Sequence, residues 1–212
     1  MEIKKYLFIK RVLDIVLALI LFFVLSPIMV LAAIASKIED GRSPVFFTQK
    51  RPGKDEKIFK IFKFRSMIPV TEKDGRKLSD KERLTKVGSI IRKTSVDELP
   101  QLINIIKGEM SFIGPRPLLV EYLPYYTEQE RIRHTIRPGI TGMVQVTGRN
   151  SLKWDERLKK DIEYVESISF LLDTRIFFRT LVEIIKRSDR GEDVSATLGN
   201  FAKVRSKTIK TI

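Results

Sequence analysis

The sequence contains no cysteine, and His134 is the only histidine among its 212 residues. The absence of cysteine excludes disulfides, thiolate zinc sites and cysteine nucleophiles. A single histidine excludes a His-rich metal centre and leaves one candidate base for a Ser–His pair. Neither a G-x-x-x-x-G-K-[ST] loop nor a G-x-G-x-x-G segment occurs, so P-loop and Rossmann nucleotide sites have no sequence support. Any chemistry must therefore depend on carboxylates, lysine, arginine, hydroxyls or a hard metal ion.

Basic residues are in strong excess: 40 Lys and Arg face 26 Asp and Glu, which gives a formal net charge of +14. This excess predicts an anionic partner, namely nucleic acid, a phosphorylated substrate or acidic lipid. No recognisable DNA- or RNA-reading motif is present, so nucleic acid is not the expected partner. Hydrophobic residues make up 43% of the chain, which is enough for an ordinary core.

An uncharged run extends from Ile15 to Ala35, long enough for a helix of roughly 30 Å, about the hydrocarbon thickness of a bilayer. Length alone favours a single spanning helix. The run is longer than the apolar part of a cleavable signal peptide, although Ala33-Ile34-Ala35 resembles a cleavage site.

Two features favour a re-entrant segment instead. Ser26-Pro27 lies near the middle of the run, where Pro27 cannot donate to the carbonyl of Phe23, so we expect a kink there with the Ser26 hydroxyl bonding an upstream carbonyl. Basic residues also flank both ends, which favours keeping both ends cytoplasmic. These residues are Lys4, Lys5, Lys10, Arg11, Lys37, Arg42, Lys50 and Arg51. The residues alone leave the spanning and re-entrant interpretations equally open.

Beyond this run the pattern predicts a β-hairpin followed by short helices. Val45–Gln49 and Ile58–Phe64 read as its strands, and a helix should begin near Asp97 and end at Gly108. Further helices are expected over Glu128–Ile136, Leu152–Ser167 and Arg175–Lys186. Gly139-Ile140-Thr141-Gly142 reads as a tight turn, and the polar residues after Arg187 as a loosely held tail.

Asp97-Glu98 is the most suggestive pair for chemistry. Ser95-x-x-Glu98 fits a capping box, and on spacing alone that structural interpretation is the favoured one. The functional interpretation is that a carboxylate held at a helix start beside Arg92 stays ionised, and can attack phosphorus or bind Mg²⁺.

Several cations are candidates for binding phosphate. Arg116 is held between Pro115 and Pro117, and its planar fork matches phosphate oxygens. Arg149 and Lys63 are weaker candidates on the residues alone. Asp161 and Asp173 would ordinarily be surface acids of helices, and His134 reads as structural.

Four segments together resemble the bacterial sugar transferases, monotopic phosphoglycosyl transferases that begin glycan assembly on polyprenol phosphate. They are Lys60–Met67, Ser95–Gln101, Lys107–Pro117 and Arg137–Gly142. The resemblance extends roughly from Lys10 to Arg187. The chain looks like the small form, similar to the enzyme that starts protein N-glycosylation in Campylobacter-like bacteria.

The resemblance implies transfer of a sugar 1-phosphate from a UDP-sugar to undecaprenyl phosphate, with release of UMP. It implies that Asp97 is the nucleophile, that Glu98 is a catalytic residue and Mg²⁺ ligand, and that Ser26-Pro27 breaks a re-entrant helix. It also implies a set of substrate-binding residues: Lys63, Arg92, Arg116, Arg149, Asp161 and Asp173. The alternative is a non-catalytic, membrane-tethered polybasic module that binds acidic lipid or nucleic acid.

Together these observations predict an α/β, α-rich fold with a re-entrant helix-break-helix, a small β-hairpin and several amphipathic helices at the membrane interface. The expected divisions are a membrane anchor over 1–38, a cytoplasmic transferase domain over 39–187 and a polar tail over 188–212. The expected location is the cytoplasmic face of the inner membrane, with anionic lipids as further partners and a homo-oligomer permitted.

Overall fold

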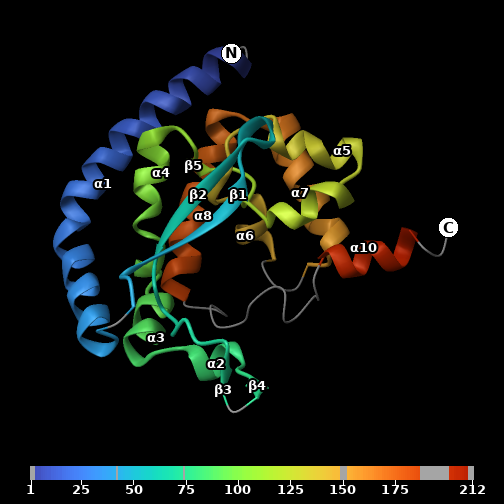
Figure 1. The fold of residues 1–212 in the computed structure, drawn as a ribbon. Helices are drawn as coiled ribbons and strands as arrows, with labels where there is room; N and C mark the ends of the chain where they lie inside the picture. The colour runs from blue at the N-terminus through green and yellow to red at the C-terminus, as the bar shows by residue number, and fades with distance from the viewer. Residues whose placement is uncertain (1–2, 42, 74, 149–151, 187–200, 210–212) are drawn as a thin grey trace.

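A long N-terminal helix, α1 (Ile3–Glu39), runs along one side of a body built from short helices and small sheets (Figure 1). The computed structural model describes residues 3–41, 43–73, 75–148, 152–186 and 201–209. The chain is rich in helix with two-stranded sheets, in agreement with the α-rich fold that the sequence predicts.

The elements of the body follow in chain order. The α-helices are α2 (Asp80–Arg83), α3 (Lys86–Lys93), α4 (Gln101–Lys107), α5 (Glu128–Arg131), α6 (Met143–Thr147), α7 (Trp154–Ser167), α8 (Phe170–Lys186) and α10 (Phe201–Ile209). The 3₁₀ turns are η1 (Lys54–Glu56), η2 (Val96–Glu98), η3 (Val120–Tyr125) and η4 (Ile132–His134). The strands are β1 (Phe46–Pro52), β2 (Ile58–Phe64), β3 (Glu72–Lys73), β4 (Arg76–Lys77), β5 (Ser111–Ile113) and β6 (Gly139–Thr141).

The helix α1 has one face in the protein core and the other faces exposed. Its buried residues recur at helical spacing, so they form a single stripe: Tyr6, Asp14, Ala18, Met29 and Ala32. This stripe contributes to three of the hydrophobic clusters of the body. The rest of the helix exposes large apolar side chains, among them Phe23 at 72% and Leu31 at 66%. Alone among the described helices, α1 is long and apolar enough to cross a membrane.

The helix continues through Pro27 without interruption. Because Pro27 has no N–H, the carbonyl of Phe23 loses its normal donor, and the Ser26 hydroxyl donates to that carbonyl at 2.7 Å. The expected hydroxyl–carbonyl bond is therefore confirmed. The two halves of the segment form one continuous helix, and its re-entrant path through a membrane stays a prediction.

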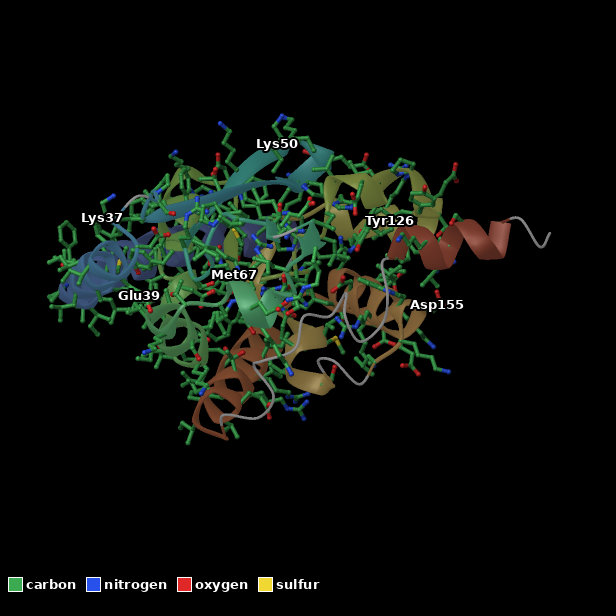
Figure 2. All side chains as sticks on the ribbon, turned by 60° about the horizontal axis from the view of Figure 1, so that its bottom comes forward. Lys37, Glu39, Lys50, Met67, Tyr126 and Asp155 are labelled. Carbon is green, nitrogen blue, oxygen red and sulfur yellow. The ribbon has the colours of Figure 1, made fainter. Side chains whose placement is uncertain are left out.

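Both ends of α1 are tied to the body. Near its start, Tyr6 and Lys10 both donate to Asp173 of α8 at 2.5 Å. At its other end, the carboxylate of Glu39 accepts the backbone N–H groups of Lys86 and Val87 at 2.8 and 2.9 Å, which pairs the open first turn of α3. Glu39 is labelled beside this helix in Figure 2. Both ends of α1 are thus fixed to helices of the body, α8 and α3.

The predicted hairpin is present. Strands β1 and β2 pair antiparallel from Phe46 opposite Phe64 to Pro52 opposite Ile58. The side chains of Phe59 and Ile61 are buried, as the alternation of a half-buried strand requires, and Phe64 at the end of the strand is buried in a separate cluster. Helix α4 lies between this hairpin and α1 (Figure 1).

The segment after Arg137 is a strand and not the expected tight turn. Strand β6 pairs parallel with β5, with Gly139 opposite Ser111 and Thr141 opposite Ile113. A Cβ on Gly139 would lie 2.2 Å from the Gly114 nitrogen, so only glycine allows this approach. The predicted stop of α4 at Gly108 is confirmed, with Gly108 at φ 87°.

The expectation of a loosely held tail is wrong for residues 201–209. They form α10, whose Phe201 is fully buried against Tyr122, Tyr126 and Trp154 at ring-centroid distances of 5.2 to 5.4 Å. A single large aromatic side chain therefore fixes this helix, which the polar composition around it did not indicate.

We predict that Asp173→Asn destabilises the protein by about 3 kcal/mol, because the buried Lys10 loses the carboxylate with which it pairs directly. Chemical unfolding in detergent measures the change. The matched control is Glu163→Gln on α7, which removes an exposed i,i+3 pair with Lys160 and should cost about 0.5 kcal/mol or less. Equal stability of the two variants would contradict the claim that Asp173 anchors α1.

Candidate functional site

The Asp97-Glu98 pair lies in the turn η2, between the end of α3 and the start of α4. Ser95 adopts a left-handed conformation at φ 59°, which reverses the chain after α3. Pro100 then begins α4, where a missing N–H costs nothing. Ser95 makes no side-chain cap to this turn, so the capping-box interpretation of Ser95-x-x-Glu98 is wrong. The Glu98 carboxylate is directed elsewhere.

Two cations share one oxygen of Glu98. Its Oε1 accepts from Lys63 Nζ at 2.7 Å and from Arg116 Nη2 at 2.9 Å. Lys63 comes from β2 and Arg116 from the loop after β5, so three separate segments meet at this carboxylate. The two cations hold the pKa of Glu98 far below its ordinary value, despite its partial burial. Glu98 is therefore permanently ionised.

Asp97 has the opposite environment. Its side chain is 8% exposed, and burial raises its pKa to about 6, helped by the negative charge of Glu98. Lys63, Arg92 and Arg116 limit the rise. Ionised Asp97 thus costs the folded state about 3 kcal/mol, a cost fully present above pH 6 and absent below the ordinary aspartate pKa. A carboxylate whose ionised form is destabilised by burial, and which lies beside cations that suit an anionic substrate, has the properties expected of a nucleophile.

Asn104 of α4 brings Lys63 to the acidic pair. This fully buried side chain accepts the N–H of Phe62 at 3.1 Å and donates to the carbonyl of Lys60 at 2.7 Å. It therefore completes the hydrogen bonding of β2 and fixes the strand to α4. Sequence reasoning missed Asn104, because one amide in an apolar helix gives no signal of its partner strand.

The loop of Arg116 is held by its backbone. Pro115 and Pro117 are buried, while Arg116 itself is exposed. The N–H of Gly114 donates to the carbonyl of Thr141 at 2.9 Å, and the N–H of Gly139 donates to that of Pro115 at 3.0 Å. The predicted rigidity of this Gly-Pro-Arg-Pro segment is present, and its side chain faces Glu98.

Asp161 and Asp173 lie inside the protein and not on helix surfaces. Asp161 is 5% exposed and its Oδ2 accepts Arg133 Nε and Nη2 at 3.0 and 2.8 Å. Asp173 accepts Tyr6, Lys10 and Tyr164. Both carboxylates serve internal links in this structure, and a direct contact with substrate stays a prediction for each.

Two further predicted cations are less closely placed. Arg92 lies in the last turn of α3, exposed, and its charge lowers the pKa of Asp97. Arg149 lies outside the described residues. His134 is buried and stacks on Tyr126, and burial lowers its pKa to about 3, consistent with the structural role expected for it.

Among the described residues, no three acids or histidines lie together as a metal-binding group. Mg²⁺ usually takes one or two carboxylates together with substrate phosphates and water. The Asp97-Glu98 pair fits that pattern, since it supplies two adjacent carboxylates beside two cations that suit substrate phosphates.

Comparison with known proteins gives a consistent result. The family model for bacterial sugar transferases matches residues 5–187. An uncharacterized sugar transferase, EpsL, of Bacillus subtilis is 44% identical over 83% of this chain and 87% of its own length. The undecaprenyl-phosphate galactose phosphotransferase of Salmonella typhimurium is 36% identical over 85% of this chain and 41% of its own. The UDP-glucose:undecaprenyl-phosphate glucose-1-phosphate transferase of Escherichia coli is 40% identical over 81% of this chain and 39% of its own.

We predict that neighbouring charges move the pKa of Asp97 in opposite directions. Glu98→Gln should lower it below about 6, since a negative neighbour is lost, and Lys63→Met should raise it, since a cation is lost. Carbon-13 NMR of protein labelled at aspartate carboxyls measures both shifts, with Asp97→Asn identifying the signal. The electrostatic description fails if Lys63→Met lowers the pKa or Glu98→Gln raises it.

Proposed function

The chain belongs to the bacterial sugar transferase family, and we propose that it transfers a sugar 1-phosphate from a UDP-sugar to undecaprenyl phosphate, releasing UMP. The two relatives with named activities are transferases of this kind, which supports the general reaction. The observation that carries the proposal is Asp97, a buried carboxylate of raised pKa beside three cations. This arrangement suits attack on an anionic phosphorus centre.

In the first step, the Asp97 carboxylate oxygen attacks the phosphorus that bears the sugar. A new carboxyl–phosphorus bond forms, and the bond from that phosphorus to the bridging oxygen breaks. UMP leaves with the bonding electron pair. In the second step, a phosphate oxygen of undecaprenyl phosphate attacks the same phosphorus and the carboxyl–phosphorus bond breaks. Asp97 returns as a carboxylate, and the lipid carries the sugar through a diphosphate.

A covalent intermediate lets a water-soluble donor and a lipid acceptor use one site in turn. Lys63 and Arg116, which share Glu98 in the structure, are the groups that receive the donor's diphosphate. Arg92 and Arg149 would add positive charge around the bound diphosphate, as their positions in the family motifs imply. Charge on the transferred phosphoryl group is thereby offset by residues already in place.

Glu98 is the residue that would hold Mg²⁺ in this proposal, beside the Asp97 nucleophile. When bound, the cation would offset the charge of the diphosphate and of the departing UMP.

The membrane attachment is proposed to be monotopic, on the cytoplasmic face of the inner membrane. Supporting this, α1 is joined to the body at both ends and along its inner face, so a straight crossing of the bilayer would draw the body into lipid. Instead, in this proposal α1 enters and leaves by one leaflet, with its apolar outer faces in the acyl chains.

Helix α8 supplies a second apolar surface for the same leaflet. Its exposed apolar residues include Phe170, Leu171, Phe178 and Ile185. Arg175 and Arg179 are also exposed on this helix and suit anionic headgroups, each worth about 1 kcal/mol near such a surface. The acidic pair would then lie near the headgroup plane, where both substrates arrive.

We predict that Asp97→Asn reduces UMP release from a UDP-sugar, with Mg²⁺ and undecaprenyl phosphate present, by at least about a thousandfold, because an amide cannot form the intermediate. A luminescent UMP assay across a panel of UDP-sugars measures the rate, and EDTA should abolish it. The matched control is Asp80→Asn, at an exposed aspartate of α2 (52% side-chain exposure), which should keep full activity. Turnover by Asp97→Asn at the wild-type rate would refute the nucleophile. Salt-sensitive lipid binding without any turnover would favour a non-catalytic module.

We further predict that the start of α1 and the residues after α1 lie on one side of the membrane. The absence of cysteine makes any introduced thiol unique, so Lys5→Cys and Lys203→Cys can each be labelled in membrane vesicles of known orientation. Both should react with an impermeant maleimide from the cytoplasmic side only. Labelling of the two positions from opposite sides would show a spanning helix.

A further inference from the structure

Arg133 is a buried arginine that links Asp161 to the loop of Arg116. It lies in η4, 3% exposed. Its Nε and Nη2 donate to Asp161 Oδ2, and Nη2 also donates to the backbone carbonyl of Arg116 at 2.8 Å. One guanidinium thus joins a carboxylate of α7 to the peptide that carries a candidate substrate-binding side chain.

This contact adds a third backbone restraint to the Arg116 loop. The strand bonds already fix Gly114 and Pro115, and Arg133 fixes the next carbonyl along the chain. With the backbone held on both sides of its Cα, the Arg116 side chain starts from a defined point and reaches Glu98 at 2.9 Å. A guanidinium is needed for this, because lysine has no rigid fork to hold a carboxylate and a carbonyl together.

The aromatic ring of Tyr126 also contacts Arg133. Its guanidinium carbon lies 5.6 Å from the ring centre of Tyr126, within cation–π range. Tyr126 in turn packs on Phe201 of α10 at 5.4 Å, and Arg205 of α10 pairs with Glu130 and with Asp155. Tyr126 and Asp155 are labelled beside the start of α10 in Figure 2. The C-terminal helix therefore packs against Tyr126, the ring that contacts Arg133.

We propose that Arg133 is a positioning residue of the transfer reaction, which holds Arg116 where the donor's diphosphate binds, and that α10 braces it through Phe201 and Tyr126. This inference rests on the proposed function. Arg133 acts only through Arg116, so its contribution to donor binding must vanish when the side chain at position 116 can no longer bind phosphate. A purely structural ion pair would reduce stability but would not show that dependence.

A double-mutant cycle on the full-length protein tests the dependence. Arg133→Lys should weaken UDP binding, measured by calorimetry, and raise the KM for the donor, each by about tenfold. In an Arg116→Lys background the same substitution should cost less than about twofold. Using UDP affinity as one readout makes the cycle independent of residual turnover in the Arg116 variant.

Arg131→Lys is the matched control. Arg131 also holds a carboxylate, Glu56, with one arm and a backbone carbonyl, Leu123, with the other. It lies two residues before Arg133 but contacts neither Arg116 nor Asp161 through any hydrogen bond described. Its substitution should leave UDP affinity and donor KM unchanged. That result would show that the effect of Arg133→Lys comes from the location of Arg133 and not from replacing an arginine by a lysine.

Phe201→Ala gives a second route that leaves the buried ion pair intact, in case Arg133→Lys does not fold. It should weaken UDP binding by about threefold in the wild-type background and leave it unchanged in the Arg116→Lys background. Melting temperatures of all variants serve as the fold control. Equal losses in both backgrounds, or full UDP affinity in folded Arg133→Lys, would overturn the inference while UMP release by wild type stands. If wild type releases no UMP with any UDP-sugar, the proposed function fails, and the inference fails with it.

Discussion

A single carboxylate oxygen organises the candidate site. Oε1 of Glu98 accepts Lys63 from the hairpin and Arg116 from the loop after β5, so it joins segments far apart in the chain. The same pairing divides the acidic pair into two different groups. Glu98 stays ionised because two cations hold it, and Asp97 has a raised pKa because it is buried beside that negative charge. Two carboxylates with opposite pKa shifts thus arise from adjacent residues of one short turn, as the proposed roles of metal ligand and nucleophile require.

The membrane helix and the site are one structure and not an anchor with a separate domain. The inner face of α1 packs on the helices and strands that carry the acidic pair, and its ends are fixed by Asp173 and Glu39. Its outer faces remain apolar and exposed. In the proposed membrane attachment, the same helix would contact both the core and lipid, so side-chain packing would set the distance between the bilayer and Asp97. A reaction that joins a soluble donor to a lipid acceptor needs such a fixed distance.

The features that local sequence patterns determine could be predicted. Contacts between residues far apart in the sequence could not. Aromatic and β-branched residues predicted the hairpin, Gly108 the end of α4, and Ser26-Pro27 the hydroxyl–carbonyl bond. The family motifs indicated Asp97 and Glu98 together with their cations. Partners brought together only by the fold were missed: Asn104 fixes β2, and Arg133 read as an ordinary basic residue of a helix. Phe201 was hidden in a polar tail, because one aromatic residue gives no periodic signal.

The most direct test of the central claim is to trap the intermediate. Wild-type protein would be mixed with its UDP-sugar in the absence of undecaprenyl phosphate, quenched in acid within milliseconds to seconds, digested and examined by mass spectrometry. The account predicts one sugar phosphate added to the peptide that contains Asp97, lost again when undecaprenyl phosphate is supplied before the quench. Active protein that carries no adduct on that aspartate, or carries it on another residue, would contradict the account.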